Sequence, residues 1–159
     1  MPGKMQKTNA MRILDKLKTP HECLEYPHGG TALEGTEVAR LLGQDPACVF
    51  KTLATSGAGG VFIFVIPVNR ELDLKKAAAA VGAKSVAMLP VAKLVQTVGY
   101  ARGACSPIGM KKQFVTVFDA SALTKDKIFI SGGQLGSQIC LKPEDAISIS
   151  CARTADITR

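Results

Sequence analysis

The sequence predicts a single α/β domain around a mixed β-sheet, and three observations support this fold class. Short runs with the period-two pattern of strands are interleaved with runs that show the helical spacing of apolar residues. Neither an internal repeat nor a low-complexity linker divides the 159 residues. A chain of this length suits one domain with a sizeable hydrophobic core. We therefore treat 1–159 as one domain and expect residues 1–6 to be disordered.

The first part of the chain predicts two helices separated by a short strand. A helix begins after Thr8, which can cap it, carries apolar residues at a spacing of three, and ends near Pro20. Residues 23–26 alternate weakly, as in a short strand. Thr36 can cap a second helix over 37–43, which has an acidic first turn and a final glycine.

The middle of the chain predicts a β-hairpin with one fully covered strand. Residues 47–55 and 61–68 are two apolar runs, and the glycine-rich turn 56–60 joins them. The second run is apolar on both faces, which is typical of a central strand that is covered on both sides.

The rest of the chain again mixes helices with strands. A strong helix over 72–82 ends in glycine, and a helix over 91–98 leads into a glycine-rich loop. A final helix starts within 142–147, with Pro143 in its first turn. Short strands are predicted at 84–88, 114–118, 127–131 and 139–141.

The formal net charge of +7 is concentrated in one segment. Residues 51–112 carry nine basic and two acidic residues. A basic surface favours phosphate-bearing partners such as nucleic acid, although excess lysine is also a common solubility feature. The chain has no tryptophan and 5% aromatic residues, which argues against a protein dedicated to stacking the bases of single strands.

Several function classes find no support in the sequence. No apolar run is long enough to span a membrane and the N-terminus lacks a secretory signal, so we expect a cytoplasmic protein with no membrane partner. The five cysteines form no C-x-x-C pair, which argues against a disulfide framework and a zinc site. Most of them are expected to be reduced core residues. We predict no metal and no cofactor.

The glycine-rich loop 99–109 is the first candidate binding element. Its sequence, GYARGACSPIG, combines three glycines with Pro107, which favours a stiff loop with accessible backbone. Basic side chains border it: Arg102, Lys111 and Lys112. Exposed N–H groups edged by cations suit a polar or anionic ligand. The alternative is a tight connection between a helix and a strand.

A second candidate is Lys51, which lies within the apolar strand predicted at 47–55. A lysine in such a position either extends from a sheet edge or points into a cleft that uses its charge. Cys105 and Ser106 are potential nucleophiles in the loop, but the sequence assigns no base to either. His28, one of two histidines, is expected to be a surface residue.

Four motifs in order along the chain resemble those of a known family. They are FKTL at 50–53, PV at 67–68 with LDLKK at 72–76, the loop 99–109 with Lys111 and Lys112, and ISGG at 130–133. Together they resemble the YbaK/EbsC family of aminoacyl-tRNA deacylases, which is related to the editing domain of prolyl-tRNA synthetase. The resemblance runs from the first helix to about residue 150 and looks closest to the free-standing Cys-tRNA(Pro) deacylases. It implies a mixed, barrel-like β-sheet surrounded by helices.

The resemblance also implies a site that positions the aminoacyl ester and does not contribute a general base. The element from Gly103 to Pro107 would hold the aminoacyl ester with its backbone, and Lys51 would contact phosphate or ribose at the tRNA 3′ end. The substrate's own thiol would attack its ester, releasing tRNA and forming a thiolactone. The implied catalytic residues are Lys51 and Gly103; the substrate-binding residues are Tyr26, Ala104, Cys105, Ser106, Pro107 and Gln138; the tRNA-binding residues are Arg102, Lys111 and Lys112.

Two positions depart from the family pattern. Gln138 stands where some relatives carry an aspartate, so a carboxylate contact is lost there. Ala104 replaces a frequent glycine and adds a methyl group close to the substrate. The first change puts a role for position 138 in doubt, whereas the second can alter the choice of amino acid.

The sequence therefore predicts an enzyme that deacylates mischarged tRNA in trans, with Cys-tRNA(Pro) as the expected substrate. The resemblance implies tRNA as a partner and prolyl-tRNA synthetase as a second candidate partner, and leaves monomer and homodimer open. Two alternatives remain. One is a deacylase for Ala-tRNA(Pro) or another small amino acid; the other is a non-catalytic module that binds tRNA ends or a synthetase.

Overall fold

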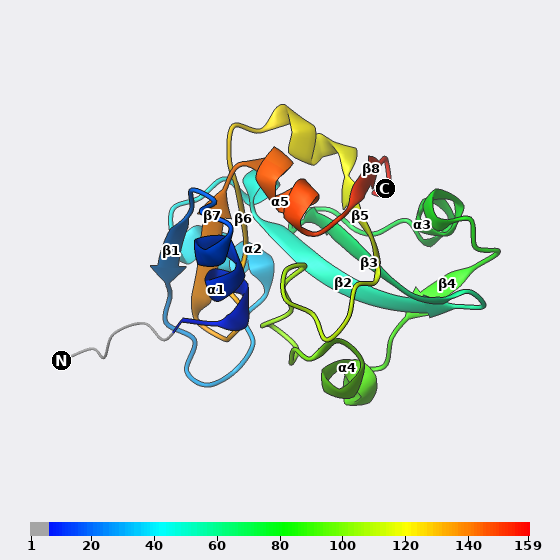
Figure 1. The fold of residues 1–159 in the computed structure, drawn as a ribbon, viewed down its shortest axis with the longest axis horizontal. Coiled ribbons are helices and arrows are strands. Elements are labelled where there is room, and N and C mark those ends of the chain that lie inside the picture. Colours follow the sequence, from blue (N-terminus) through cyan, green and yellow to red (C-terminus); the bar gives the residue numbers. More distant parts are fainter. Residues whose placement is uncertain (1–6) are drawn as a thin grey trace.

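The structure, a computed structural model, describes residues 7–159 and has the predicted mixed α/β fold class (Figure 1). Its strands form two sheets, and its helices pack around them. The prediction of disorder for residues 1–6 lies outside the described residues. No helix in the described part is long and apolar enough to cross a membrane.

The larger sheet is mixed and has β3 at its centre. β2 pairs antiparallel with β3 and β4, whereas β5 is parallel to β3 and β8. The predicted hairpin is confirmed as β2 and β3, and β3 is buried over almost its whole length, as its apolar sequence predicts. In sheet order the strands are β4 (Val86–Met88), β2 (Phe50–Gly57), β3 (Gly60–Pro67), β5 (Val115–Asp119) and β8 (Arg153–Ala155).

The smaller sheet has three antiparallel strands and stands beside the larger one in Figure 1. An isolated parallel bridge between Val49 and Phe129 joins it to the beginning of β2. Both sheets have open strand orders, so neither is a closed barrel. The strands are β1 (Glu22–Glu25), β7 (Ser137–Leu141) and β6 (Ile128–Ser131).

The helices divide the core between the two faces of the larger sheet. On one face α3 packs Ala77 and Ala78 against Phe62 and Phe64. On the other face α1, α5 and the end of α4 share the larger core with β6 and β7, and the loop 99–109 contributes Tyr100, Cys105 and Ile108 to it. The loop is therefore anchored in the core. The helices are α1 (Asn9–Lys16), α2 (Gly35–Leu41), α3 (Leu74–Val81), α4 (Val91–Val98) and α5 (Pro143–Ile149).

Helix α2 begins earlier than the sequence predicts. Its N-cap is Glu34 rather than Thr36, and the Glu34 side chain makes no capping hydrogen bond. The missing side chain of Gly35 allows this start, because a Cβ there would lie 2.2 Å from Cγ1 of Val68. The long-range contact with Val68 thus prevails over the local preference for a threonine cap.

Three short elements also differ from the predictions. Residues predicted as the start of a strand form the 3₁₀ helix Pro46–Cys48, because the Asp45 carboxylate accepts a hydrogen bond from the Ala47 N–H. A second 3₁₀ helix (Ala120–Thr124) and strand β8 lack a periodic signal and are absent from the sequence prediction. Elements of three to five residues depend on tertiary contacts more than on local pattern.

The cysteines are less buried than predicted. Cys105 and Cys140 are buried, whereas Cys23 and Cys151 are exposed and Cys48 is intermediate. The expectation that most cysteines are core residues is therefore wrong, because Cys23 lies on the edge strand β1 and Cys151 follows the end of α5.

Candidate functional site

A hollow of about 690 Å³, here called the main hollow, lies beside the first half of β2. Segments far apart in the sequence line it: parts of 26–38, the beginning of β2, residues between 88 and 94, and part of the loop 99–109. The last residues of β6 and the first of β7 complete the lining. The hollow thus lies where the two sheets meet.

Six of the predicted site residues line the main hollow: Tyr26, Lys51, Arg102, Gly103, Cys105 and Gln138. They come from four separate segments of the chain. The fold therefore brings together residues that the sequence analysis had connected only through the family resemblance. The other five predicted residues are absent from this lining: Ala104, Ser106, Pro107, Lys111 and Lys112. The first three are buried within the loop, and the two lysines are exposed beyond it.

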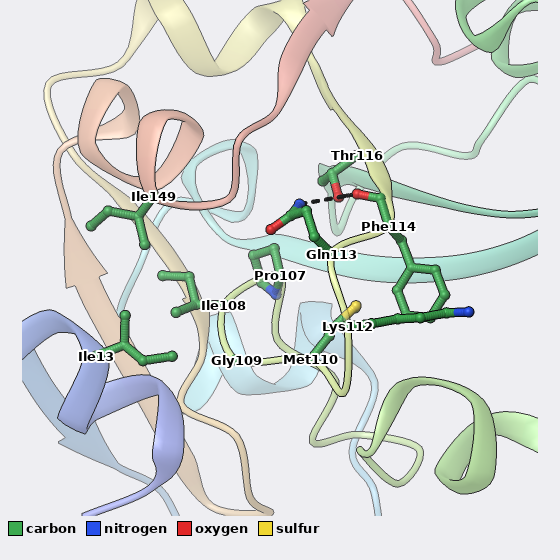
Figure 2. A pocket seen from close by; sticks show the side chains of 10 residues that line it. All are labelled: Ile13, Pro107, Ile108, Gly109, Met110, Lys112, Gln113, Phe114, Thr116 and Ile149. Atoms are coloured by element: carbon green, nitrogen blue, oxygen red, sulfur yellow. Dashed lines mark hydrogen bonds between the residues drawn. The ribbon is translucent and has the colours of Figure 1, made fainter.

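A second hollow of about 200 Å³ is lined in part by Pro107 and Lys112 (Figure 2). Of its polar side chains, Gln113 and Thr116 already have hydrogen-bond partners in the chain, and the Lys112 ammonium group lies over the Phe114 ring. The Gln113 amide donates hydrogen bonds to the carbonyls of Phe114 and Ser150, and the Thr116 hydroxyl donates to Phe114. Because these groups are satisfied, we place the candidate site in the main hollow.

Lys51 occupies an open stretch of the β2 edge. β2 pairs with β4 only from Thr55 to Gly57, so no strand of that sheet covers Lys51 on this side. Its side chain is partly buried and lines the main hollow. Within residues 7–159 the ammonium group has neither an ion-pair nor a hydrogen-bond partner. Its charge and three donors are therefore available to a ligand.

Gly103 brings the loop backbone close to Ala32, another residue that lines the hollow. Its φ is +84°, and a Cβ at this position would lie 2.6 Å from Cβ of Ala32 and 2.9 Å from Cδ2 of Leu135. In the described residues the N–H groups of Gly103 and Cys105 have no hydrogen-bond partner, whereas Ala104 donates to Ala101. Both residues line the hollow, and backbone donors without a partner in the described chain can stabilise a developing oxyanion.

Internal hydrogen bonds hold the loop in this shape. The Tyr100 hydroxyl donates to the Ile108 carbonyl, and the Ile108 N–H donates to the Ser106 hydroxyl oxygen at 3.3 Å. Ser106 is fully buried. Its position argues against a nucleophilic serine and agrees with the stiff loop that the glycines and Pro107 predict.

Burial keeps the Cys105 thiol protonated. It raises the pKa of Cys105 to about 12, so the reactive thiolate is scarce near neutral pH. This favours a thiol that acts as part of the wall rather than as a nucleophile.

Alkylation can test this protonation state. At pH 8 we expect iodoacetamide to modify the exposed Cys23 and Cys151 while native Cys105 stays unmodified, and Cys105 labelling to increase as the pH approaches 12 because the thiolate forms there. Mass spectrometry of digested protein measures each site, and labelling in urea shows that every cysteine can react. Fast labelling of native Cys105 at pH 8 would contradict a buried, protonated thiol.

Gln138 is tied to a residue that follows α2. Its side-chain amide donates to the Gln44 carbonyl at 3.0 Å and accepts from the Gln44 amide at 2.7 Å. Gln138 is 3% exposed and lies on β7. The reciprocal pair makes this part of the lining neutral and joins the α2 segment to the smaller sheet.

Sequence reasoning missed five polar residues that line the main hollow: Glu34, Thr36, Thr52, Ser131 and Ser137. The hydroxyl oxygens of Thr52 and Ser137 are buried and have no hydrogen-bond partner in the described chain. Buried polar atoms usually find partners, so these two hydroxyls are exceptions in the described chain, although neither oxygen is accessible from the hollow. For Thr52 the sequence offered a weak indication, because this residue belongs to the FKTL motif at 50–53 and directly follows Lys51. For Ser137 the sequence offered no indication.

The phenol of Tyr26 stands at the edge of the hollow. Burial raises the pKa of Tyr26, so the hydroxyl remains a neutral donor and acceptor at neutral pH. The lining described includes no histidine, and no group of three or more His, Cys, Asp or Glu within residues 7–159 could hold a metal ion. The site offers cations, N–H donors and hydroxyls, a set suited to positioning a polar, phosphate-bearing ester.

Comparison with known proteins agrees with this chemistry. The family model described as "Aminoacyl-tRNA editing domain" matches residues 31–149. A curated protein of Enterococcus faecalis, "Putative Cys-tRNA(Pro)/Cys-tRNA(Cys) deacylase EbsC", is 46% identical over 154 residues, covering 96% of this chain and 94% of that protein. A proline–tRNA ligase of Thermosipho melanesiensis is 26% identical over 121 residues, covering 76% of this chain but 21% of the ligase.

Solved structures share the fold. One described as "Crystal structure of a putative trans-editing enzyme for prolyl tRNA synthetase" superposes with a TM-score of 0.83 at 22% identity, covering 97% of this chain and 99% of the other. Another, described as a hypothetical protein, has a TM-score of 0.85 at 21% identity and covers 96% and 100%. The matched family model spans most of the chain, including every residue that lines the main hollow except Tyr26. The chain therefore belongs to the aminoacyl-tRNA editing domain family.

Proposed function

We propose that this protein deacylates mischarged aminoacyl-tRNA in trans and that Cys-tRNA(Pro) is its substrate. The observation that carries the proposal is the main hollow, which is lined by Lys51, Gly103 and Cys105; in residues 7–159 the Lys51 ammonium group and the N–H groups of Gly103 and Cys105 have no partner. The name of the Enterococcus faecalis relative, which is similar over nearly its whole length, supports the same reaction class.

The lining suggests a role for each group. Lys51 and Arg102 bind phosphate or ribose oxygens at the tRNA 3′ end, because both cations line the hollow without an ion-pair partner in the described chain. The N–H groups of Gly103 and Cys105 hold the ester carbonyl oxygen as it gains negative charge. Lys111 and Lys112 extend the basic surface beyond the hollow and would contact more distant phosphates.

The reaction itself needs no nucleophile from the protein. In Cys-tRNA the substrate thiol loses its proton, and its sulfur forms a bond to the ester carbonyl carbon. The bond from that carbon to the ribose oxygen breaks, the oxygen takes up a proton, and a cysteine thiolactone leaves with free tRNA as the second product. The protonated Cys105 and the fully buried Ser106 leave this role to the substrate. The protein contributes orientation and charge stabilisation.

A deacylation panel tests the proposal. Purified protein is incubated with Cys-tRNA(Pro), Ala-tRNA(Pro), Pro-tRNA(Pro) and Cys-tRNA(Cys), with and without prolyl-tRNA synthetase. We expect Cys-tRNA(Pro) to be deacylated at least about tenfold faster than Ala-tRNA(Pro), because alanine lacks the attacking thiol. Equal rates for alanine and cysteine would favour a deacylase for small amino acids instead. Tight tRNA binding without turnover on any substrate would favour a binding module.

A further inference from the structure

Glu34 is the one carboxylate among the described residues that line the main hollow. The two other charged lining residues, Lys51 and Arg102, are cations. Glu34 is the N-cap residue of α2, but its side chain does not cap the helix, and it forms no ion pair with any residue in 7–159. This carboxylate is therefore exposed at the hollow and committed to no other group.

The rest of the lining provides no substitute for this negative charge. Gln138 is neutral, and both ends of its amide are already bonded to Gln44. The hydroxyls of Thr52 and Ser137 are uncharged. A cationic group of a ligand in this hollow thus meets two repelling side chains and a single attracting one.

An aminoacyl ester carries such a cationic group. The α-amino group of model compounds has a pKa of about 7.7–8.0, so much of it is protonated near neutral pH. The same substrate carries phosphates at its tRNA end, and these satisfy Lys51 and Arg102. One substrate therefore requires both cations and an anion, and the lining of the hollow offers both.

We propose that Glu34 binds the α-ammonium group of the aminoacyl ester and selects substrates whose α-amino group is free. The inference rests on the proposed deacylase function. It assigns Glu34 a role in specificity: esters whose α-nitrogen is an uncharged amide, such as peptidyl-tRNA, lose this ion pair and are deacylated less well. The thiol-dependent step stays the same, since N-acylation leaves the cysteine sulfur untouched.

The test compares Cys-tRNA(Pro) with N-acetyl-Cys-tRNA(Pro), which keeps the thiol but not the charge. For the wild type we expect kcat/KM to be about fivefold higher with the free amine, mainly through KM, which is the scale of a solvent-exposed ion pair. The Glu34→Gln variant should treat the two substrates within about twofold of each other, whereas Glu34→Asp should keep the preference.

Glu37→Gln is the matched control. It also removes one negative charge from α2, but the Glu37 carboxylate is paired with Arg40 and is not part of the hollow lining. This variant should discriminate as the wild type does. If wild type and Glu34→Gln show the same preference for the free amine, Glu34 has no such role and the inference is overturned.

Binding separates this inference from the function on which it rests. Non-hydrolysable amide-linked analogues of cysteinylated tRNA, with the α-amine free or acetylated, are titrated against both proteins. Weaker binding of the acetylated analogue to wild type but not to Glu34→Gln supports the role of Glu34 even where turnover is absent. Turnover of Cys-tRNA(Pro) with identical affinities for the two analogues retains the deacylase function and rejects the role of Glu34.

Discussion

The Lys51→Ala variant is expected to lose at least about 100-fold in kcat/KM for Cys-tRNA(Pro) deacylation, the scale on which one charge-stabilising donor acts in an enzyme site. Lys51 lies on the open edge of β2, lines the main hollow, and has no competing partner in the described chain. Its ammonium group can therefore be used entirely by the substrate. Initial rates with radiolabelled Cys-tRNA(Pro) measure the loss.

The fold should survive this substitution. Lys51 is partly exposed, so truncation removes little buried apolar surface and is expected to lower the free energy of unfolding by less than about 1 kcal/mol. Urea unfolding of both proteins checks this. Lys51→Arg should retain part of the activity because it keeps the charge, although its planar group places the donors differently.

Lys75→Ala is the matched control for a general loss of positive charge. Lys75 is exposed on α3, which packs on the face of the larger sheet that carries the separate core of Phe62 and Phe64. Long-range attraction of tRNA should fall similarly in both variants, and only Lys51→Ala should lose turnover at saturating tRNA. Normal turnover by the Lys51→Ala protein would count against the proposed site.

The Gly103→Ala variant is expected to lose both stability and activity. A positive φ costs a side-chain-bearing residue about 1–2 kcal/mol, and the added Cβ would meet Ala32 at 2.6 Å and Leu135 at 2.9 Å. Since Ala32 and Leu135 must move, the Gly103 and Cys105 N–H groups shift as well. A displacement of about 1 Å in positioning groups can reduce turnover about 100-fold.

A second glycine separates backbone strain from collision. Gly82, the C-cap of α3, has φ +70° and open space where a Cβ would be added. Gly82→Ala should therefore cost about 1 kcal/mol of stability through strain alone and leave deacylation unchanged. If Gly103→Ala matched Gly82→Ala in both stability and activity, the close approach of the loop to Ala32 would have no functional weight.

Local sequence patterns were sufficient for the long, periodic elements. The helix at 91–98, the glycine that ends α3 and the hairpin of β2 and β3 follow from apolar spacing and from positions that require a positive φ. The prediction of Thr36 as the cap of α2 was wrong, because the contact of Gly35 with Val68 outweighed a threonine cap preference of about 1 kcal/mol. Family motifs named Lys51, Gly103 and Gln138, but periodicity alone assigned none of them a shared site.

The amino-acid sequence thus predicted the α/β class, the stiff loop and the basic segment, because each of these features depends on residues within a few positions of one another. Only the tertiary structure showed that Tyr26, Lys51, Gly103 and Gln138 line one hollow. It alone showed that the amide of Gln138 is held by Gln44, 94 residues away, and that Glu34 is left without a partner among the described residues. Such pairings depend on which side chains the fold brings together. A local sequence pattern does not predict contacts between residues that are so far apart in the chain.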